Sequence, residues 1–243
     1  MHSYQSCAAL KASAKEHMFG RYGSAIGAYL IVTFLTGFAT LSVTSLTGNT
    51  DSVFSMCIHY ALLFAISVFT GLLSSGTAYF YLKIVTGHPA AVSDVFYGFH
   101  MHSDKAISIQ TWITLITFIG SLPEYIVLYR MSGRPDASTL TLYGLCMILS
   151  GVIALILDLL YAPAFFLMHD FPQYSARELM VMSRKLMVGN KGRLFYLYLS
   201  YLPLLLLSIL SCGIALLWVF PYLNATLAEF YMDIITHSKT SDH

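Results

Sequence analysis

Long apolar runs separated by short polar segments constrain this chain more than any other feature of its sequence. The run at residues 26–46 contains no charged residue, and its length of about 21 residues matches the roughly 30 Å hydrocarbon core of a bilayer. Only 10% of the 243 residues are charged, whereas an average soluble domain carries roughly 25%. Because so few charges cannot cover a surface that faces water, most of the outer surface must face lipid. The sequence therefore predicts a helical membrane protein with several spans.

Applied along the whole chain, the same criterion predicts a single all-α domain over residues 1–243, a polytopic transmembrane helical bundle. An alternative for the C-terminal part is one kinked helix through Pro221 whose tail leaves the membrane, which gives five spans. We favour six, because an even number of crossings places Lys239 on the side that holds most other basic residues. The predicted spans are residues 26–46, 53–82, 106–129, 140–168, 194–210 and 214–235.

Two further segments, residues 4–19 and 175–188, are too charged to span and are predicted to be amphipathic helices at the cytoplasmic interface. In the second, Ser175 and Glu178 stand three residues apart, as in a capping box, and Gly189 suits a helix end. Its apolar residues fall on one side of a helical wheel and most charged residues on the other. We expect the basic residues of this region to dock on anionic inner-leaflet lipid or on a membrane-protein partner: Arg177, Arg184, Lys185, Lys191 and Arg193.

Lysine and arginine are distributed unevenly between the two sides that this threading defines. The side opposite the N-terminus holds only Arg130 and Arg134. The positive-inside rule places the basic side in the cytoplasm, so we predict a cytoplasmic membrane protein with a cytoplasmic N-terminus. Since this bias accounts for the basic charge, nucleic acid is not an expected partner. Ten basic residues precede or connect spans on the N-terminal side: Lys11, Lys15, Arg21, Lys83, Lys105, Arg177, Arg184, Lys185, Lys191 and Arg193.

Two stretches of the C-terminal third carry a distinctive pattern. Residues 176–200 read A-R-E-x4-S-x2-L-M-x-G-x-K-x2-L-F-x-L-x-L-S, and residues 213–231 read G-I-x2-L-W-x2-P-Y-x3-T-x-A-x-F-Y. Both stretches resemble a bacterial integral-membrane family known as domain of unknown function 975. Weaker matches lie near the N-terminus and at residues 96–99. The chain departs from the family around Pro123, where the family has Ile-Pro-Gly and this sequence has Leu-Pro-Glu. The resemblance implies a bacterial multi-span membrane protein and carries no established activity.

Ionisable residues inside spans are costly, so each is a candidate functional residue. The threading places Asp158 and Glu229 at similar depth, towards the cytoplasmic side. One hypothesis is a polar pocket that opens to the cytoplasm and binds a cation, a proton or a lipid headgroup, built from Asp158, Glu229, Asn224 and Lys83. The simpler interpretation, which we favour on the sequence alone, is that these residues lie at the interface or bond to hydroxyl groups between helices.

Motifs for catalysis and cofactor binding are missing from the sequence. It contains no GxSxG, HExxH, Walker A or GxGxxG pattern, and its four cysteines are scattered, so we predict no catalytic residue, cofactor or metal site. Our first interpretation is a non-enzymatic scaffold or accessory subunit. The alternative is a small transporter or lipid-handling protein that uses the polar pocket. A cavity that reaches Asp158 would favour the alternative, and a tightly packed interior would favour the scaffold.

Overall fold

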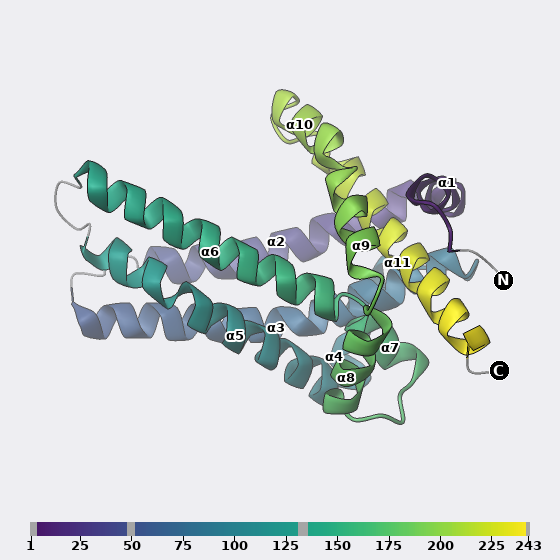
Figure 1. Ribbon diagram of the computed structural model, residues 1–243, viewed down its shortest axis with the longest axis horizontal. Coiled ribbons are helices and arrows are strands. Elements are labelled where there is room, and N and C mark those ends of the chain that lie inside the picture. Colours follow the sequence, from purple (N-terminus) through teal and green to yellow (C-terminus); the bar gives the residue numbers. More distant parts are fainter. Residues whose placement is uncertain (1–3, 48–51, 131–135, 242–243) are drawn as a thin grey trace.

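The computed structural model describes residues 4–47, 52–130 and 136–241, which form helices and connecting turns without any strand. Along the bundle, α2 packs on α3, α3 on α5, and α5 on α6. The predicted all-α architecture is confirmed. The four long helices that lie side by side are α2 (Tyr22–Thr47), α3 (Val53–Val85), α5 (Ser103–Arg130) and α6 (Ala137–Tyr161), as Figure 1 shows.

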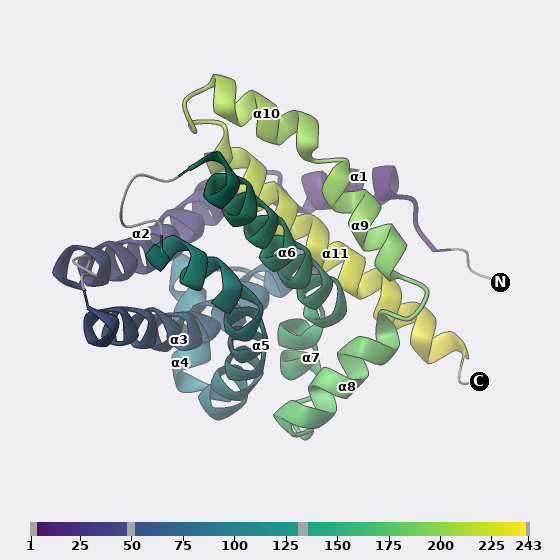
Figure 2. The same cartoon turned by 60° about the vertical axis from the view of Figure 1, so that its left-hand side comes forward.

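The C-terminal part of the chain forms a hairpin that crosses the bundle at an angle (Figures 1 and 2). Its first arm consists of α9 (Lys191–Leu199) and α10 (Leu202–Leu210), and its second arm is α11 (Leu216–Ser241). Cys212 and Gly213 turn the chain between the arms with positive φ angles of 52° and 87°. The second arm packs against α1, α2 and α3, so it ties the N-terminal helix to the bundle.

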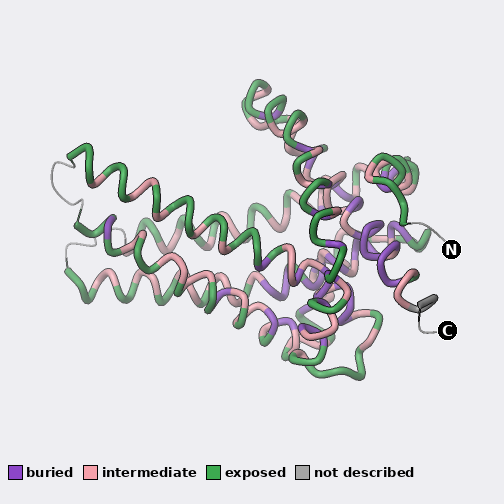
Figure 3. Tube along the Cα trace, viewed as in Figure 1, coloured by how far each residue is buried: buried purple, intermediate pink, exposed green. Residues whose placement is uncertain are grey.

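The shorter helices gather at one end of the molecule, which we call the basic end. Buried residues concentrate there, whereas the bundle is mostly half-buried or exposed towards the opposite, far end (Figure 3). The exposed residues of the bundle include Phe34, Phe38 and Ile148, an apolar surface that suits lipid rather than water. The helices of the basic end are α1 (Cys7–Met18), the 3-10 helix η1 (Val92–Phe96), α4 (Tyr97–His100), α7 (Ala164–Asp170) and α8 (Ala176–Leu186).

Five helical stretches among the described residues are long and apolar enough to cross a membrane. The sixth predicted span, now α11, is not one of them. It nevertheless runs from the tip of the hairpin back to the basic end, where the backbone N–H of Gln5 donates to Asp233. Both ends of the described chain thus lie together, as the six-span threading expects. The five stretches are Tyr22–Thr47, Val53–Val85, Ser103–Arg130, Ala137–Asp170 and Lys191–Leu210.

Prolines divide two of the predicted spans. The span expected at residues 140–168 breaks between α6 and α7 at Pro163, and the span expected at 194–210 breaks between α9 and α10 just before Pro203. A proline has no N–H to donate to the preceding turn, so these breaks follow from the sequence. Pro123 and Pro221, in contrast, lie inside the continuous helices α5 and α11.

Both predicted amphipathic helices are present, each slightly shorter than expected, at α1 and α8. The capping box of α8 is also present: Ser175 N–H donates to the Glu178 carboxylate at 2.8 Å, and Glu178 N–H donates to the Ser175 hydroxyl at 3.4 Å. The Ser175 hydroxyl also donates to this carboxylate at 2.8 Å. The bond from the Ser175 N–H and, after it, the bond from the Ser175 hydroxyl lower the pKa of Glu178. The apolar face of α8 is packed inward, and Leu179 and Met180 are buried.

Glycines allow the connection between α3 and α5 to pack closely on α3. A Cβ at Gly76 would lie 1.9 Å from the carbonyl oxygen of Val95, and one at Gly98 would lie 2.2 Å from the carbonyl oxygen of Leu72. Real Cβ atoms do not approach so closely, so η1 and α4 can reach α3 only because both glycines lack side chains. This connection is thereby fixed against the bundle.

Candidate functional site

A cavity of about 590 Å³ lies within the bundle, in the half nearer the basic end. Side chains from α2, α3, α5 and α6 form most of its wall, and α9 and α11 contribute Tyr198 and Asn224. We call it the Asp158 cavity after the only carboxylate among its described lining residues. The interior of the bundle is therefore hollow where the sequence had suggested a polar pocket.

The wall of the Asp158 cavity is mainly apolar, with aromatic rings and a few hydroxyl and amide groups. No Lys, Arg or His is among its described lining residues. Amphiphilic molecules suit a wall of this composition, because an apolar surface with a few polar groups fixes the orientation of a ligand. The aromatic residues on the wall are Tyr29, Tyr81, Tyr161, Phe165, Phe166 and Tyr198.

Asp158 lies close to the C-terminal end of α6. It is exposed and lines the cavity, so its carboxylate is accessible from there. Tyr198 lines the same cavity. None of the ion pairs found among the described residues involves Asp158. The carboxylate therefore has no basic partner in the described part of the chain.

The Asp158 cavity separates α2 from α6. α2 packs on α3 and α11, and α6 packs on α5, α8 and α9, but within the described residues α2 and α6 do not pack against each other along their length. The cavity between them is partly open rather than sealed.

A second cavity of about 410 Å³ adjoins the first on the side of the far end. The two share lining residues, including the hydroxyl-bearing Ser67, Thr114 and Thr117. Ser67 and Thr114 are themselves hydrogen-bonded, with their oxygens 3.1 Å apart. Hydroxyl groups therefore continue along the bundle interior, up to Ser150 and Tyr60 near its far end.

The structure brings together two of the four residues of the predicted pocket. Asp158 and Asn224 line the Asp158 cavity, whereas Glu229 and Lys83 do not. Glu229 is buried on another face of α11 and pairs with His17 of α1 at 2.5 Å. Because an α-helix turns by about 100° per residue, Glu229 points well away from Asn224, five residues earlier. Similar depth in the membrane was not enough to place both carboxylates in one site.

Lys83 belongs to the packing of the basic end. Its ammonium lies 2.7 Å from the carboxylate of Asp94 in η1, and the same Asp94 oxygen accepts the backbone N–H of Ala91 at 2.9 Å. Lys83 thus holds the connection after α3 in place. The prediction that Lys83 lines the polar pocket is wrong, because its ammonium pairs with Asp94 instead.

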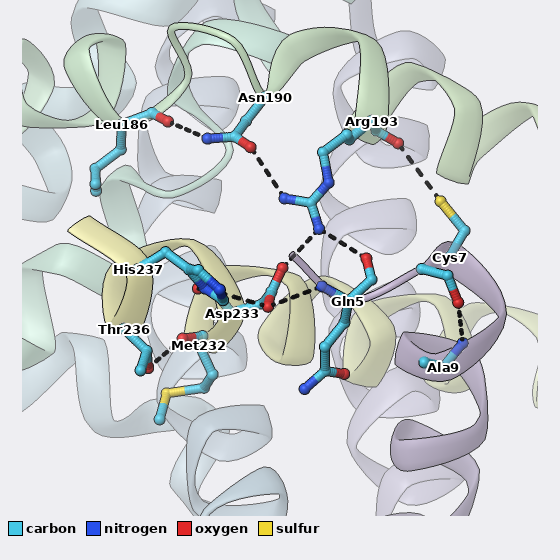
Figure 4. Close-up of polar contacts among 11 residues, drawn as sticks. Gln5, Cys7, Ala9, Leu186, Asn190, Arg193, Met232, Asp233, Thr236 and His237 are labelled. Atoms are coloured by element: carbon cyan, nitrogen blue, oxygen red, sulfur yellow. Dashed lines mark hydrogen bonds and ion pairs between the residues drawn. The ribbon is translucent and has the colours of Figure 1, made fainter. Parts of the chain in front are cut away.

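Four of the five predicted docking residues lie exposed on the surface of the basic end: Arg177, Arg184, Lys185 and Lys191. The fifth, Arg193, is engaged inside the protein (Figure 4). Its guanidinium lies 2.6 Å from the carboxylate of Asp233, whose side chain is only 2% exposed. Arg193 is therefore not available to a lipid headgroup.

The Arg193 side chain joins three separate parts of the chain (Figure 4). It donates to the backbone oxygen of Gln5 at 2.9 Å and to the side-chain oxygen of Asn190 at 2.9 Å, besides Asp233. The ring of Tyr4 lies 4.4 Å from the guanidinium carbon. The N-terminal segment, the start of α9 and the end of α11 are thereby tied by one residue.

Other basic residues of the predicted cytoplasmic side also bond to helix ends. Arg21 donates to three carbonyls at the end of α3, those of Ile84, Gly87 and His88. Lys11 donates to the carbonyl of Ser200 at 2.9 Å, and burial lowers the pKa of Lys11. Cations at helix C-termini satisfy carbonyls that have no partner within the helix. The positive charge at this end therefore serves packing, apart from the role in orientation that the sequence predicts.

Sequence reasoning missed Tyr198 as a partner of Asp158 and the aromatic wall around it. The signal available was weak, because Tyr198 lies in an apolar span where tyrosine is common at membrane interfaces. No group of three or more potential metal ligands occurs among the described residues.

The comparisons with known proteins identify one family. A family model described as "Protein of unknown function (DUF975)" matches residues 1–238. No curated protein and no solved structure matches the chain. The matched range covers nearly the whole sequence, including the Asp158 cavity and the basic end.

Proposed function

The chain belongs to the DUF975 family of proteins of unknown function, and from its geometry we propose that it binds an amphiphilic molecule in the Asp158 cavity as a small transporter or lipid-handling protein. The observation that carries this proposal is the hollow bundle interior, about 590 Å³ in volume, which reaches Asp158. A scaffold would gain packing energy from filling such a space, because protein interiors are normally close-packed.

The position of the cavity supports binding from the membrane. Its wall is mainly apolar, and it separates α2 from α6. An acyl or alkyl chain in this gap would contact apolar side chains while its polar end met the carboxylate and amide of Asp158 and Asn224. The adjoining cavity towards the far end extends this space along the bundle, which is what transfer across the membrane requires.

We further propose that the protein has no enzymatic activity and needs no cofactor. The Asp158 cavity presents a single carboxylate and, among its described lining residues, no His, Cys, Lys or Arg. Acid–base and nucleophilic catalysis both rely on paired groups, a base with a nucleophile or with a second acid. A lone carboxylate among hydroxyls and aromatic rings is better suited to recognition than to bond breaking.

For the cellular location we propose the bacterial cytoplasmic membrane, with the N-terminus in the cytoplasm. The basic residues that lead into spans gather at the end of the molecule that also holds α1 and α8. The positive-inside rule assigns such an end to the cytoplasm.

Filling the cavity tests the proposed binding. Ala154 lines both cavities, and we expect Ala154→Trp to displace bound amphiphile. Leu155→Trp, the next position on α6, is a matched control, because Leu155 is exposed and outside both linings. Native mass spectrometry of protein purified in mild detergent would measure co-purified lipid or added amphiphile. Equal occupancy in wild type and Ala154→Trp would overturn the proposal.

A second function rests on the surface of α8. Its apolar face is buried while Arg177, Arg184 and Lys185 are exposed, so this helix presents a basic surface beside the bundle. We propose that this surface docks on anionic inner-leaflet lipid or on a membrane-protein partner, as a scaffold or accessory subunit would. Neutralising all three residues to Gln should weaken association of the reconstituted protein with anionic lipid at low salt. If the triple variant associates with anionic lipid as strongly as the wild type, the docking proposal is wrong and these charges serve only to orient the protein in the membrane.

A further inference from the structure

The charge on the wall of the Asp158 cavity is of one sign. Asp158 is its only carboxylate, and no basic side chain lies among the described lining residues. A carboxylate away from water is costly unless an opposite charge or a proton compensates it. Tyr198 on the same wall is neutral and adds no positive charge. The cavity is therefore complementary to a cation.

Aromatic rings make up much of the same wall. Tyr161 and Phe165 lie within one to two helical turns of Asp158 in sequence, and Tyr29 and Tyr81 face the cavity from the opposite helices. The faces of such rings attract cations, and they suit a quaternary or substituted ammonium group because it is weakly hydrated. A carboxylate beside aromatic rings selects an organic ammonium over a strongly hydrated metal ion, which needs several oxygen ligands.

We propose that the ligand of the Asp158 cavity is an amphiphilic organic cation, with an ammonium group at Asp158 and an apolar chain along the gap between α2 and α6. This inference rests on the proposed binding function and specifies its ligand class. Anionic amphiphiles are excluded from the site by charge, since the carboxylate repels them and no basic group on the described wall offsets it. Neutral amphiphiles retain the apolar contacts but lose the ion pair.

The experiment compares three probes with the same alkyl chain: dodecyltrimethylammonium, dodecanol and dodecyl sulfate. Binding to the full-length protein in lipid nanodiscs is measured by isothermal titration, and partition into empty nanodiscs is subtracted. We expect dodecyltrimethylammonium to bind at least tenfold more tightly than dodecanol, and dodecyl sulfate to show no saturable binding. Because this comparison uses wild-type protein, it does not depend on any variant folding.

Variants then locate the effect. Asp158→Asn should abolish the preference for the cation over dodecanol, whereas Glu124→Gln should keep it. Glu124 is a carboxylate in the same bundle that accepts a hydrogen bond from Ser150 at 2.8 Å and lies outside the Asp158 cavity. Asp158→Glu, which preserves the charge, should retain part of the preference.

The outcomes separate the two proposals. Equal binding of the cation and dodecanol, abolished by Ala154→Trp, would overturn the cation inference and leave the binding function standing. A cation preference that persists in Asp158→Asn would overturn the assignment of the ammonium site. Binding of all three probes that is insensitive to Ala154→Trp would overturn both proposals.

Discussion

Polar side chains in this protein act mostly by joining helix ends. Lys83 pairs with Asp94, Glu229 with His17, and Arg193 with Asp233. Each pair links segments from different parts of the basic end, and each partner satisfies a charge that would otherwise be costly in a mainly apolar protein. Asp158 differs from these residues, because its described neighbours include no basic side chain. The contrast singles it out as a residue available to a ligand.

The Arg193–Asp233 pair should be important for stability. Asp233 is 2% exposed at its side chain, so Arg193→Ala would leave a buried carboxylate with only the His237 ring, 3.5 Å away, as an ionisable partner. Removing one partner of a buried pair costs about 3–5 kcal/mol. We expect a markedly lower thermal midpoint of unfolding in detergent, measured by fluorescence-detected size exclusion after heating. Lys191→Ala, an exposed lysine two residues earlier, is the control, and an equal effect of both variants would contradict a role for the pair.

Asp136 provides a test of pH dependence at the start of α6. Hydrogen bonds lower the pKa of Asp136 from 3.8 to about 2. The largest effect comes from the Thr139 hydroxyl, followed by the Ser138 hydroxyl and the Thr139 N–H. Asp136 caps the N-terminus of α6, where its side chain accepts the Thr139 N–H. Since the pKa of Asp136 is lower in the folded than in the unfolded protein, its carboxylate stabilises the folded protein fully above pH 3.8. This stabilisation is lost as pH falls through about 2. The difference in thermal midpoint between wild type and Asp136→Ala should therefore shrink over this pH range. A difference that is the same at pH 6 and at pH 2 would rule out this role of the carboxylate.

At the scale of elements, glycine decides how the connection after α3 packs. Gly76→Ala should destabilise the protein, because its Cβ would meet the Val95 carbonyl at 1.9 Å and overpacking costs typically about 1–3 kcal/mol. Gly144→Ala, in the middle of α6 with nothing within 4 Å of the added Cβ, should be neutral or stabilising. Thermal midpoints of both variants test this. A similar decrease of the thermal midpoint in both variants would show that the close approach of η1 to α3 does not cause the destabilisation by Gly76→Ala.

The breaks within helices show which element boundaries are encoded locally. Pro163 and Pro203 divide predicted spans, whereas Pro123 and Pro221 stand inside intact helices. All four lack the same backbone donor. What differs is position: Pro163 and Pro203 stand at the start of a following helix, where the missing N–H breaks no bond within that helix. Pro123 is exposed and Pro221 is buried, so burial alone does not decide which helices stay intact. A proline therefore marks a possible break point without fixing one.

For the whole molecule, the position of the two termini is the most direct test of the threading. Gln5 bonds to Asp233 at 3.3 Å, and Tyr4 stacks near His237 with ring centroids 4.4 Å apart. Short epitope tags at the N-terminus and at the C-terminus should therefore lie on the same side of the membrane. In intact cells a membrane-impermeant probe should reach neither tag, and after permeabilisation it should reach both. One tag accessible from outside would contradict the arrangement, and two would reverse the proposed orientation.

α11 explains why hydropathy alone undercounts the elements that build this protein. It carries Asn224, Glu229 and Asp233 and falls short of the apolar character of a span. Yet it packs on α1, α2 and α3, so neighbouring helices rather than lipid cover most of its polar residues. A helix surrounded by protein can carry charges that a lipid-facing helix cannot.

By itself, the sequence of this protein determined the fold class, four of the long helices, the capping box of α8 and the clustering of basic residues at one end. These features depend on the length, hydropathy and local hydrogen bonding of single segments. Only the tertiary structure decided that Asp158, Tyr198 and Asn224 line one cavity, while Glu229 and Lys83 pair elsewhere. The rotation of each helix about its axis sets which side chains converge, and it is fixed by contacts between segments far apart in the chain.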